Sequence, residues 1–141
     1  MNYIGSTRSN YFAVKNPEAF KVFLQQFGDL ELIEGTAEKK GLFGFLVGGD
    51  SGSLPNSKSA PDPEGEEGDV EDVDVDFIAE LAPHLADGQV GVVIEIGYEG
   101  MRFLGGYATA FNNQSQLKQL NLDDIYEVAK ELGAKVTRAE Y

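Results

Sequence analysis

The fold is decided by the stretch QVGVVIEIGYEGMRFLGGYATAF, residues 89–111. Its first part, Gln89 to Ile96, is rich in β-branched residues and predicts the best-defined strand of the chain. The segment Gly97 to Gly100 predicts a hairpin turn, and Met101 to Phe111 predicts the partner strand. The stretch therefore predicts a central β-hairpin, around which the other elements can be arranged.

Upstream of this hairpin, the sequence predicts a first strand followed by an amphipathic helix. Ser9 to Lys15 alternates between two faces, as a strand does. Asn16 can cap the helix, Pro17 suits its first position, and Gly28 is expected to end it. The apolar residues of the helix recur at helical spacing and form one face: Phe20, Phe23, Leu24 and Phe27.

Two more strands, Leu30 to Glu34 and Leu42 to Val47, are expected after this helix. A second helix should begin after Val73, with Asp74 or Asp76 as its N-cap. Pro83 either kinks that helix or begins a separate last turn. The apolar stripe of the second helix consists of Phe77, Ile78, Leu81 and Leu85.

A third helix is predicted to begin at Asn121 and to end at Gly133, and Lys135 to Glu140 is predicted to be a short edge strand. Its expected buried stripe is Ile125, Val128, Ala129 and Leu132. The element order is then β-α-β-β-loop-α-β-β-α-β. This order predicts a single α+β domain over residues 1–141, with an antiparallel or mixed sheet of about six strands and three helices.

All the excess charge of the chain comes from one window. From Ser59 to Met101 there are thirteen acidic residues and no Lys or Arg, whereas the rest of the chain has eleven acids and eleven bases. The formal net charge of −13 is therefore a local property. Any function that depends on this charge should involve that window.

The densest part of this window follows a stretch of Ser, Gly and Pro. Nine of the fifteen residues from Asp62 to Asp76 are acidic. Low hydrophobicity and high charge are typical of disorder, and like charges keep such a segment extended. We therefore expect residues 49–72 to form a disordered acidic loop within the domain.

The familiar catalytic and metal-binding motifs are absent. Without cysteine, the chain has no disulfide, thiolate ligand or Cys nucleophile. The Asp-x-Asp-x-Asp string that starts at Asp72 fails as a calcium loop, because Phe77 and Pro83 occupy the positions that need Gly and Glu. The single histidine, His84, has no nucleophile motif nearby. We therefore expect no catalytic residue, no metal and no cofactor.

The overall charge also limits the partners. At a pI of about 4.3 and without a Lys/Arg patch, direct binding to nucleic acid or to an anionic membrane is not expected. Such a charge suits a basic protein partner. The sequence has neither an apolar leader nor a run long enough to span a membrane, so a cytoplasmic location is expected.

Two segments show a resemblance to a group of known proteins. Ser9 to Phe20, SNYFAVKNPEAF, and Ile94 to Ala108, IEIGYEGMRFLGGYA, resemble segments of small acidic, uncharacterised proteins of phages, plasmids and other mobile elements. This resemblance implies an accessory role in a mobile element, such as inhibition of a host nuclease, restriction system or CRISPR complex. It assigns no functional residue.

These observations favour a non-catalytic acidic protein-binding module, which could mimic nucleic-acid phosphates toward a basic nucleic-acid-handling protein. Two alternatives remain open: a small-ligand or enzymatic pocket beside the Gly-rich strands, and an accessory domain whose acidic loop only solubilises it. The candidate partner-binding residues are Asp69, Glu71, Asp72, Asp74, Asp76, Glu80, Asp87, Glu95 and Glu99.

Overall fold

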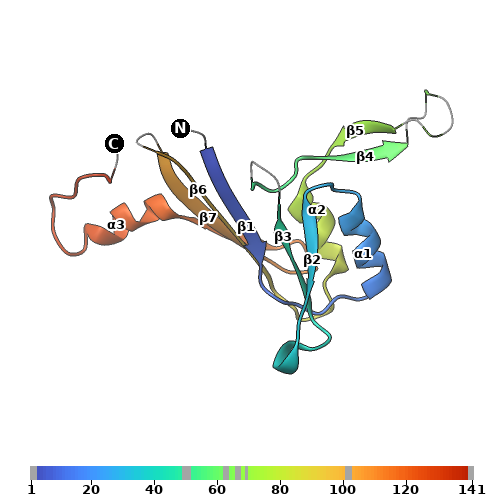
Figure 1. Cartoon of the computed structure of the whole chain (residues 1–141). Helices are drawn as coiled ribbons and strands as arrows, with labels where there is room; N and C mark the ends of the chain where they lie inside the picture. Colours follow the sequence, from blue (N-terminus) through green and yellow to red (C-terminus); the bar gives the residue numbers. More distant parts are fainter. Residues whose placement is uncertain are drawn as a thin grey trace.

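The computed structural model describes residues 3–48, 52–61, 64–65, 68, 70–100 and 103–139, and it shows an α+β fold (Figure 1). Six strands form one antiparallel sheet in the order β2-β3-β1-β6-β7-β8, and β4 and β5 pair in a separate two-strand sheet. The predicted α+β class is confirmed. Of the two sheet types left open by the sequence, the antiparallel one is formed.

The bounds of the elements are as follows. The strands are β1 Tyr3–Ser9, β2 Leu30–Glu34, β3 Phe43–Val47, β4 Ser57–Pro61, β5 Val70–Asp74, β6 Gly91–Glu99, β7 Phe103–Phe111 and β8 Leu117–Asn121. The helices in the described part are α1 Pro17–Gln25, α2 Phe77–Leu81 and α3 Ile125–Ala129. Single 3-10 turns span Ala37–Lys39, Ala82–His84 and Leu122–Asp124.

The first strand lies earlier in the chain than its sequence suggested. β1 pairs with β6 from Tyr3 opposite Glu99 to Ser9 opposite Val93, and it also pairs with β3. The predicted strand residues Phe12 and Val14 form only isolated bridges. The prediction was wrong because β1, although rich in Ser, Thr and Gly, gains two strand partners, and such tertiary pairing outweighs intrinsic propensity.

Three details of the second half also differ from the prediction. The central hairpin is confirmed, but β6 continues to Glu99, so the residues from Gly97 to Glu99 belong to a strand rather than to the turn. The polar segment after β7 contributes an additional strand, β8, as the sheet edge. The expected strand from Lys135 is not formed through Ala139, because this segment is paired with no neighbouring strand in the described part.

A hairpin replaces much of the expected acidic loop. β4 and β5 pair in register from Ser57 opposite Asp74 to Pro61 opposite Val70. The sequence suggested an irregular loop because composition alone cannot show that the β4 backbone is available as a pairing partner for β5. Figure 1 shows this hairpin projecting beyond α1 and α2, away from the main sheet.

The core lies between one face of the main sheet and the helices α1 and α2 (Figure 1). The Asn16 side chain accepts hydrogen bonds from the N–H groups of Glu18 and Ala19, which confirms the predicted N-cap of α1. Pro83 lies in a separate 3-10 turn, Ala82–His84, so the helix ends before it, which is one of the two outcomes expected. The buried cluster consists mainly of Phe12, Phe20, Phe23, Leu24, Phe27, Phe45, Phe77, Leu81, Leu85, Val93 and Phe111.

The opposite face of the sheet remains exposed, and so does the third helix. Ile94 and Ile96 on β6 are 50% and 54% exposed, although they lie in a run of β-branched apolar residues. The predicted buried stripe of α3 is also wrong: Ile125, Val128 and Leu132 are all exposed. Figure 1 shows why, since α3 extends beyond the end of the sheet on the side remote from α1 and α2.

Candidate functional site: an anchored acidic hairpin

The β4–β5 hairpin displays acidic side chains at regular spacing. Asp72 and Asp74 are two residues apart on β5, so they lie on one face about 6.8 Å apart along the strand. The residues opposite them on β4 are Ser59 and Ser57, which carry no charge. Glu71 lies on the other face of the strand. The three acids are exposed, and two of them form a short row that no base opposes on the paired strand.

A structural role accounts for Asp76, the next acid along the chain. Its carboxylate accepts a hydrogen bond from the N–H of Ala79 at 3.2 Å and caps α2. This confirms one of the two predicted caps, and Asp74 remains on the strand. A capping carboxylate also complements the positive end of the helix dipole. Asp76 therefore connects the acidic row to the core-packed helix.

An ion pair fixes the hairpin to α2. The ammonium group of Lys58 on β4 lies 2.7 Å from Oε1 of Glu80, and the two side chains are only 22% and 35% exposed. The other carboxylate oxygen, Oε2 of Glu80, is buried without a hydrogen-bond partner among the described residues. At the base of the hairpin, the N–H of Val75 donates to the carbonyl of Asn56 at 2.9 Å. The ion pair thus holds the hairpin against α2, and the Val75–Asn56 hydrogen bond closes the base of the hairpin.

The segment that leads into β4 is fixed to the main sheet. The Thr7 hydroxyl donates to the carbonyl of Gly52, and the N–H of Leu54 donates to Oε1 of Glu95 at 2.9 Å. Thr7 and Glu95 are neighbours on β1 and β6, and both side chains are buried. Glu95, which the sequence placed among the candidate contacts for a partner, therefore holds this connector in place.

The connector approaches the sheet so closely that it requires glycine. Gly52 has a φ of +61°, and a Cβ atom there would lie 2.0 Å from the carbonyl oxygen of Gly5. A larger residue would strain the backbone and push the connector off β1. Gly52 therefore allows the attachment of the connector to β1.

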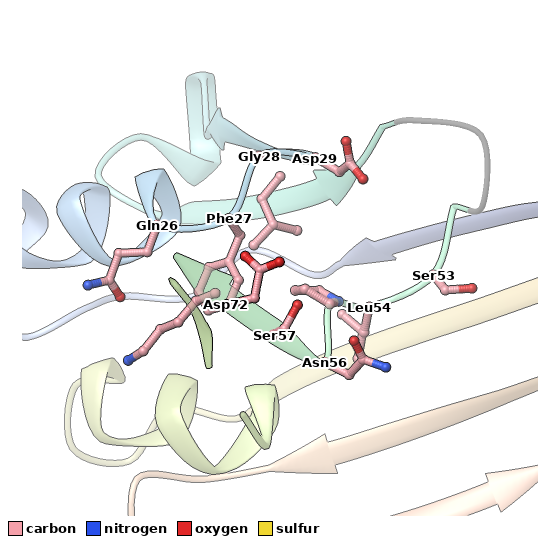
Figure 2. Close-up of a pocket in the computed structure, with 12 residues that line it drawn as sticks. Gln26, Phe27, Gly28, Asp29, Ser53, Leu54, Asn56, Ser57 and Asp72 are labelled. Carbon is pink, nitrogen blue, oxygen red and sulfur yellow. The ribbon is translucent and has the colours of Figure 1, made fainter. Parts of the chain in front are cut away.

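A polar cleft of about 420 Å³ lies at the base of the hairpin. Figure 2 shows the Asp72 carboxylate within it, between Phe27 and Ser57, with Asp29 at its edge. Backbone and side-chain groups of Asn56 and nearby residues add hydrogen-bonding capacity. The lining comes from the end of α1, the start of β2, the connector and the hairpin: Gln26, Phe27, Gly28, Asp29, Leu30, Ser53, Leu54, Pro55, Asn56, Ser57, Lys58 and Asp72.

The remaining candidate acids do not join this group. Asp87 precedes β6 and accepts a hydrogen bond from the Asn113 side chain at 2.7 Å, while Glu99 lies at the far end of β6. A nine-residue strand is about 30 Å long, so Asp87 and Glu99 belong to different ends of the sheet. Asp69 lies outside the described residues. The structure thus brings together Glu71, Asp72, Asp74, Asp76 and Glu80.

The sequence left open an alternative pocket beside the Gly-rich strands, and a hollow of about 680 Å³ lies in that region, lined by Arg8, Ser9, Asn10, Tyr11, Lys39, Leu42, Val92 and Ile94. β1 lies between β3 and β6 and contributes Arg8 and Ser9 to this lining. A second, smaller hollow of about 170 Å³ occurs near Gly97 and Gly105, next to Glu95 and Tyr107. Leu54 of the connector covers part of it. This hollow is less than half the volume of the cleft beside the hairpin.

His84 occupies a position in the aromatic core. Its ring centroid lies 4.6 Å from that of Phe23 and 6.0 Å from that of Phe20. Desolvation by this burial lowers the pKa of His84 below its usual value of 6.5. The neutral ring therefore acts as a packing residue.

Several residues that build the site gave no signal in the sequence. Thr7 is far from the acidic window in sequence, and although Gly52 and Leu54 lie just before that window, only the tertiary fold shows that they attach to Thr7 and Glu95. Lys58 gave a faint signal, because it is the last base before the acidic window begins. Asp29 follows the predicted end of α1, but its position at the cleft depends on how α1 packs beside the hairpin.

Among the described residues, no group of three or more His, Asp or Glu side chains is arranged to hold a metal ion. Within the same residues, no helix has the length and apolar character needed to cross a membrane. Comparison with protein-family models, with curated proteins and with solved structures found no match to this chain. The functional conclusion therefore depends on the geometry of the hairpin and the cleft.

Proposed function

We propose that this protein is a non-catalytic binding module that captures a basic segment of a protein partner on the β4–β5 hairpin. The observation that carries this proposal is the row formed by Asp72 and Asp74 on a strand that is fixed to the domain. Because the carboxylates are held by the backbone ladder and by the Lys58–Glu80 ion pair, their spacing is set before a partner arrives. Preorganisation of this kind lowers the cost of binding.

The cleft at the hairpin base provides a site for one side chain of the partner. An Arg or Lys side chain can place its apolar stem against Phe27 and Leu30 and its charge against Asp72. Arginine fits best, because its planar guanidinium group can form two parallel hydrogen bonds with one carboxylate. The acidic row of Asp72 and Asp74 would then contact the Lys and Arg side chains that follow in the partner's sequence.

A basic protein that handles nucleic acid is the partner class that we favour. Carboxylates at regular spacing along a strand can occupy a surface that normally holds phosphates, and their charge would speed the encounter. The resemblance of Ser9 to Phe20 and of Ile94 to Ala108 to mobile-element proteins supports a role as an inhibitor of such a host protein. The target class rests on this resemblance, whereas the binding surface rests on the hairpin geometry.

The proposal is tested with a fluorescent oligo-arginine peptide as the probe. The double variant Asp72→Asn/Asp74→Asn should bind it about five- to tenfold more weakly, because two exposed charge pairs of up to about 1 kcal/mol each are lost. Fluorescence anisotropy measures the affinity, and added salt should weaken wild-type binding.

The matched control is Glu38→Gln/Glu131→Gln, which removes the same amount of charge at two exposed positions off the hairpin. This control should change the affinity by less than about twofold. If both double variants weaken binding equally, the net charge alone attracts the peptide. The hairpin would then be a solubilising element rather than a binding surface.

A further inference from the structure

The face of the main sheet that α1 and α2 leave uncovered is a continuous apolar surface. The strand register places Ile4 beside Tyr98 and Tyr98 beside Leu104 in one row across β1, β6 and β7. The next rows contain Ile96 beside Gly106 and Ile94 beside Ala108, and Leu120 of β8 continues the latter row. Its large exposed members are Ile4, Ile94, Ile96, Tyr98, Leu104, Leu120 and Leu122.

This surface is large enough for a stable interface. The seven side chains are 45% to 63% exposed, and together they present on the order of 700 Å² of mainly apolar surface. A standard protein–protein interface buries about 800 Å² per partner. Contiguous exposed apolar patches on monomeric proteins rarely exceed a few hundred Å². The uncovered face therefore exceeds what a solvated sheet face normally carries.

The charge distribution is compatible with a second copy of the chain as the occupant. This face carries two basic side chains, Arg8 on β1 and Lys118 on β8, and the edge strand β2 adds one exposed acid, Glu31, in the same row as Arg8. The acidic β4–β5 hairpin projects from the helical side of the molecule (Figure 1). Two copies can therefore bring these faces together while their acidic hairpins remain apart.

The shape of the face is also compatible with self-association. β7 contributes a strip of small residues to it, Gly106, Ala108 and Ala110, between the larger side chains of β6 and β8. A Cβ atom at Gly106 would lie 3.2 Å from both Ile96 and Leu122, so these two side chains flank the strip closely. In a two-fold arrangement the β6 side chains of each copy can lie over the small residues of the other. Such packing of two sheets face to face is the geometry of a β-sandwich.

We infer that the protein forms a symmetric homodimer through this face, with Ile94, Ile96, Tyr98 and Leu104 at the centre of the interface. Each copy then supplies the second layer that its partner's sheet lacks. The interface is separate from the acidic hairpin, so this inference does not depend on the proposed function. A dimer would display two hairpins and could bind a partner with two basic segments more tightly.

Sedimentation equilibrium over a range of concentrations tests the inference. The wild-type chain should have twice the 15.3 kDa mass of one copy. Ile96→Asp places an unpaired charge between Ser6 and Gly106 and should weaken dimerisation at least about thirtyfold, the ratio that corresponds to an interface hot spot of about 2 kcal/mol. Because Ile96 is exposed in a single copy, the variant should keep the far-ultraviolet circular dichroism of the wild type.

Leu132→Asp is the matched control, since it introduces the same charge at a 93% exposed apolar residue outside the sheet face. It should leave the dimer intact. A dimer that survives Ile96→Asp but is lost in Leu132→Asp would assign the interface to the α3 region and overturn the inference. A wild-type chain that stays monomeric up to millimolar concentration would overturn it as well, including the case in which a different protein covers the face.

A second measurement does not depend on a destabilising substitution. The sequence contains no cysteine, so a spin label at Ser6→Cys would be the only one in each copy. Ser6 is exposed and lies opposite Ile96 on this face. The dimer should show strong dipolar coupling between the two labels, whereas a label at Glu38→Cys should show weaker coupling. Equal weak coupling at both positions would contradict a face-to-face dimer.

Discussion

The two faces of the main sheet both carry large apolar side chains but differ in what covers them. On one face, Phe45 and Val93 are buried beneath α1 and α2, whereas on the other Ile94 and Ile96 are about half exposed. Strands that are buried on both faces have continuous hydrophobic sequences rather than alternating ones. β6 has such a sequence, with Val92, Val93, Ile94 and Ile96. In the described part of the chain, α1 and α2 cover one face of this central strand and leave the apolar side chains of the other face exposed.

The largest expected effect comes from removing a ring on the covered face. Phe45→Ala should lower the free energy of unfolding by about 3–5 kcal/mol, because it leaves a cavity beneath α2. The Phe45 side chain is fully buried, and its ring meets the edge of Phe77 with centroids 5.4 Å apart. Urea denaturation followed by circular dichroism measures this loss.

Ile94→Ala is the matched change on the open face. At protein concentrations at which the chain is monomeric, this substitution should lower the free energy of unfolding by less than about 1.5 kcal/mol. Half of the Ile94 side chain is already in contact with water. Its cost should increase with protein concentration if the open face is covered in a dimer. If Phe45→Ala and Ile94→Ala lower the free energy of unfolding equally at the lowest protein concentration, the two faces do not differ in burial as described.

A smaller loss of stability is expected from a change at Glu95, a buried polar residue on the covered face. Glu95→Ala removes the acceptor for the N–H of Leu54 and should lower the free energy of unfolding by about 1–2 kcal/mol. Amide hydrogen exchange at Leu54 should become faster, because the connector is then held at one point fewer. Glu95→Gln keeps a side-chain oxygen at the same position and should restore most of the protection. Unchanged exchange in Glu95→Ala would show that Glu95 does not fix the connector.

Local signals predicted the parts of the fold that depend on neighbouring residues. The cap at Asn16 and the central hairpin were predicted, and the separate turn at Pro83 was one of two outcomes left open, since each depends on a few consecutive residues. β1 was misplaced because its sequence is a poor strand former, and only pairing with β3 and β6 makes it a strand. The burial predicted for Ile125 also failed, because periodicity shows that a helix has an apolar face but not whether anything covers it.

The candidate site could be predicted only in part for the same reason. Charge counting located Asp72 and Asp74, because an acidic run can be recognised without knowledge of the fold. It could not separate these exposed carboxylates from Glu95, which is buried and holds the connector. Nor could it find the Lys58–Glu80 ion pair, whose partners are 22 residues apart and meet only when the hairpin packs on α2.

The smallest expected effect concerns the pH dependence of the covered face, through His84. Because burial lowers the pKa of His84 in the folded chain, the unfolded chain binds a proton more readily. The contribution of the neutral ring is fully present above the unfolded value of 6.5, and it decreases as the pH falls from there through the lower folded pKa. For a single proton, the free energy of unfolding cannot change by more than about 1.4 kcal/mol per pH unit.

Urea denaturation of the wild type and of His84→Phe between about pH 7.5 and pH 5 isolates the contribution of His84, because the other titrating groups are common to both chains. The wild type should lose stability relative to His84→Phe over this range, since Phe preserves the contacts with Phe20 and Phe23 without binding a proton. A constant difference between the two chains would show that His84 titrates alike in the folded and unfolded states, and would contradict the lowered pKa.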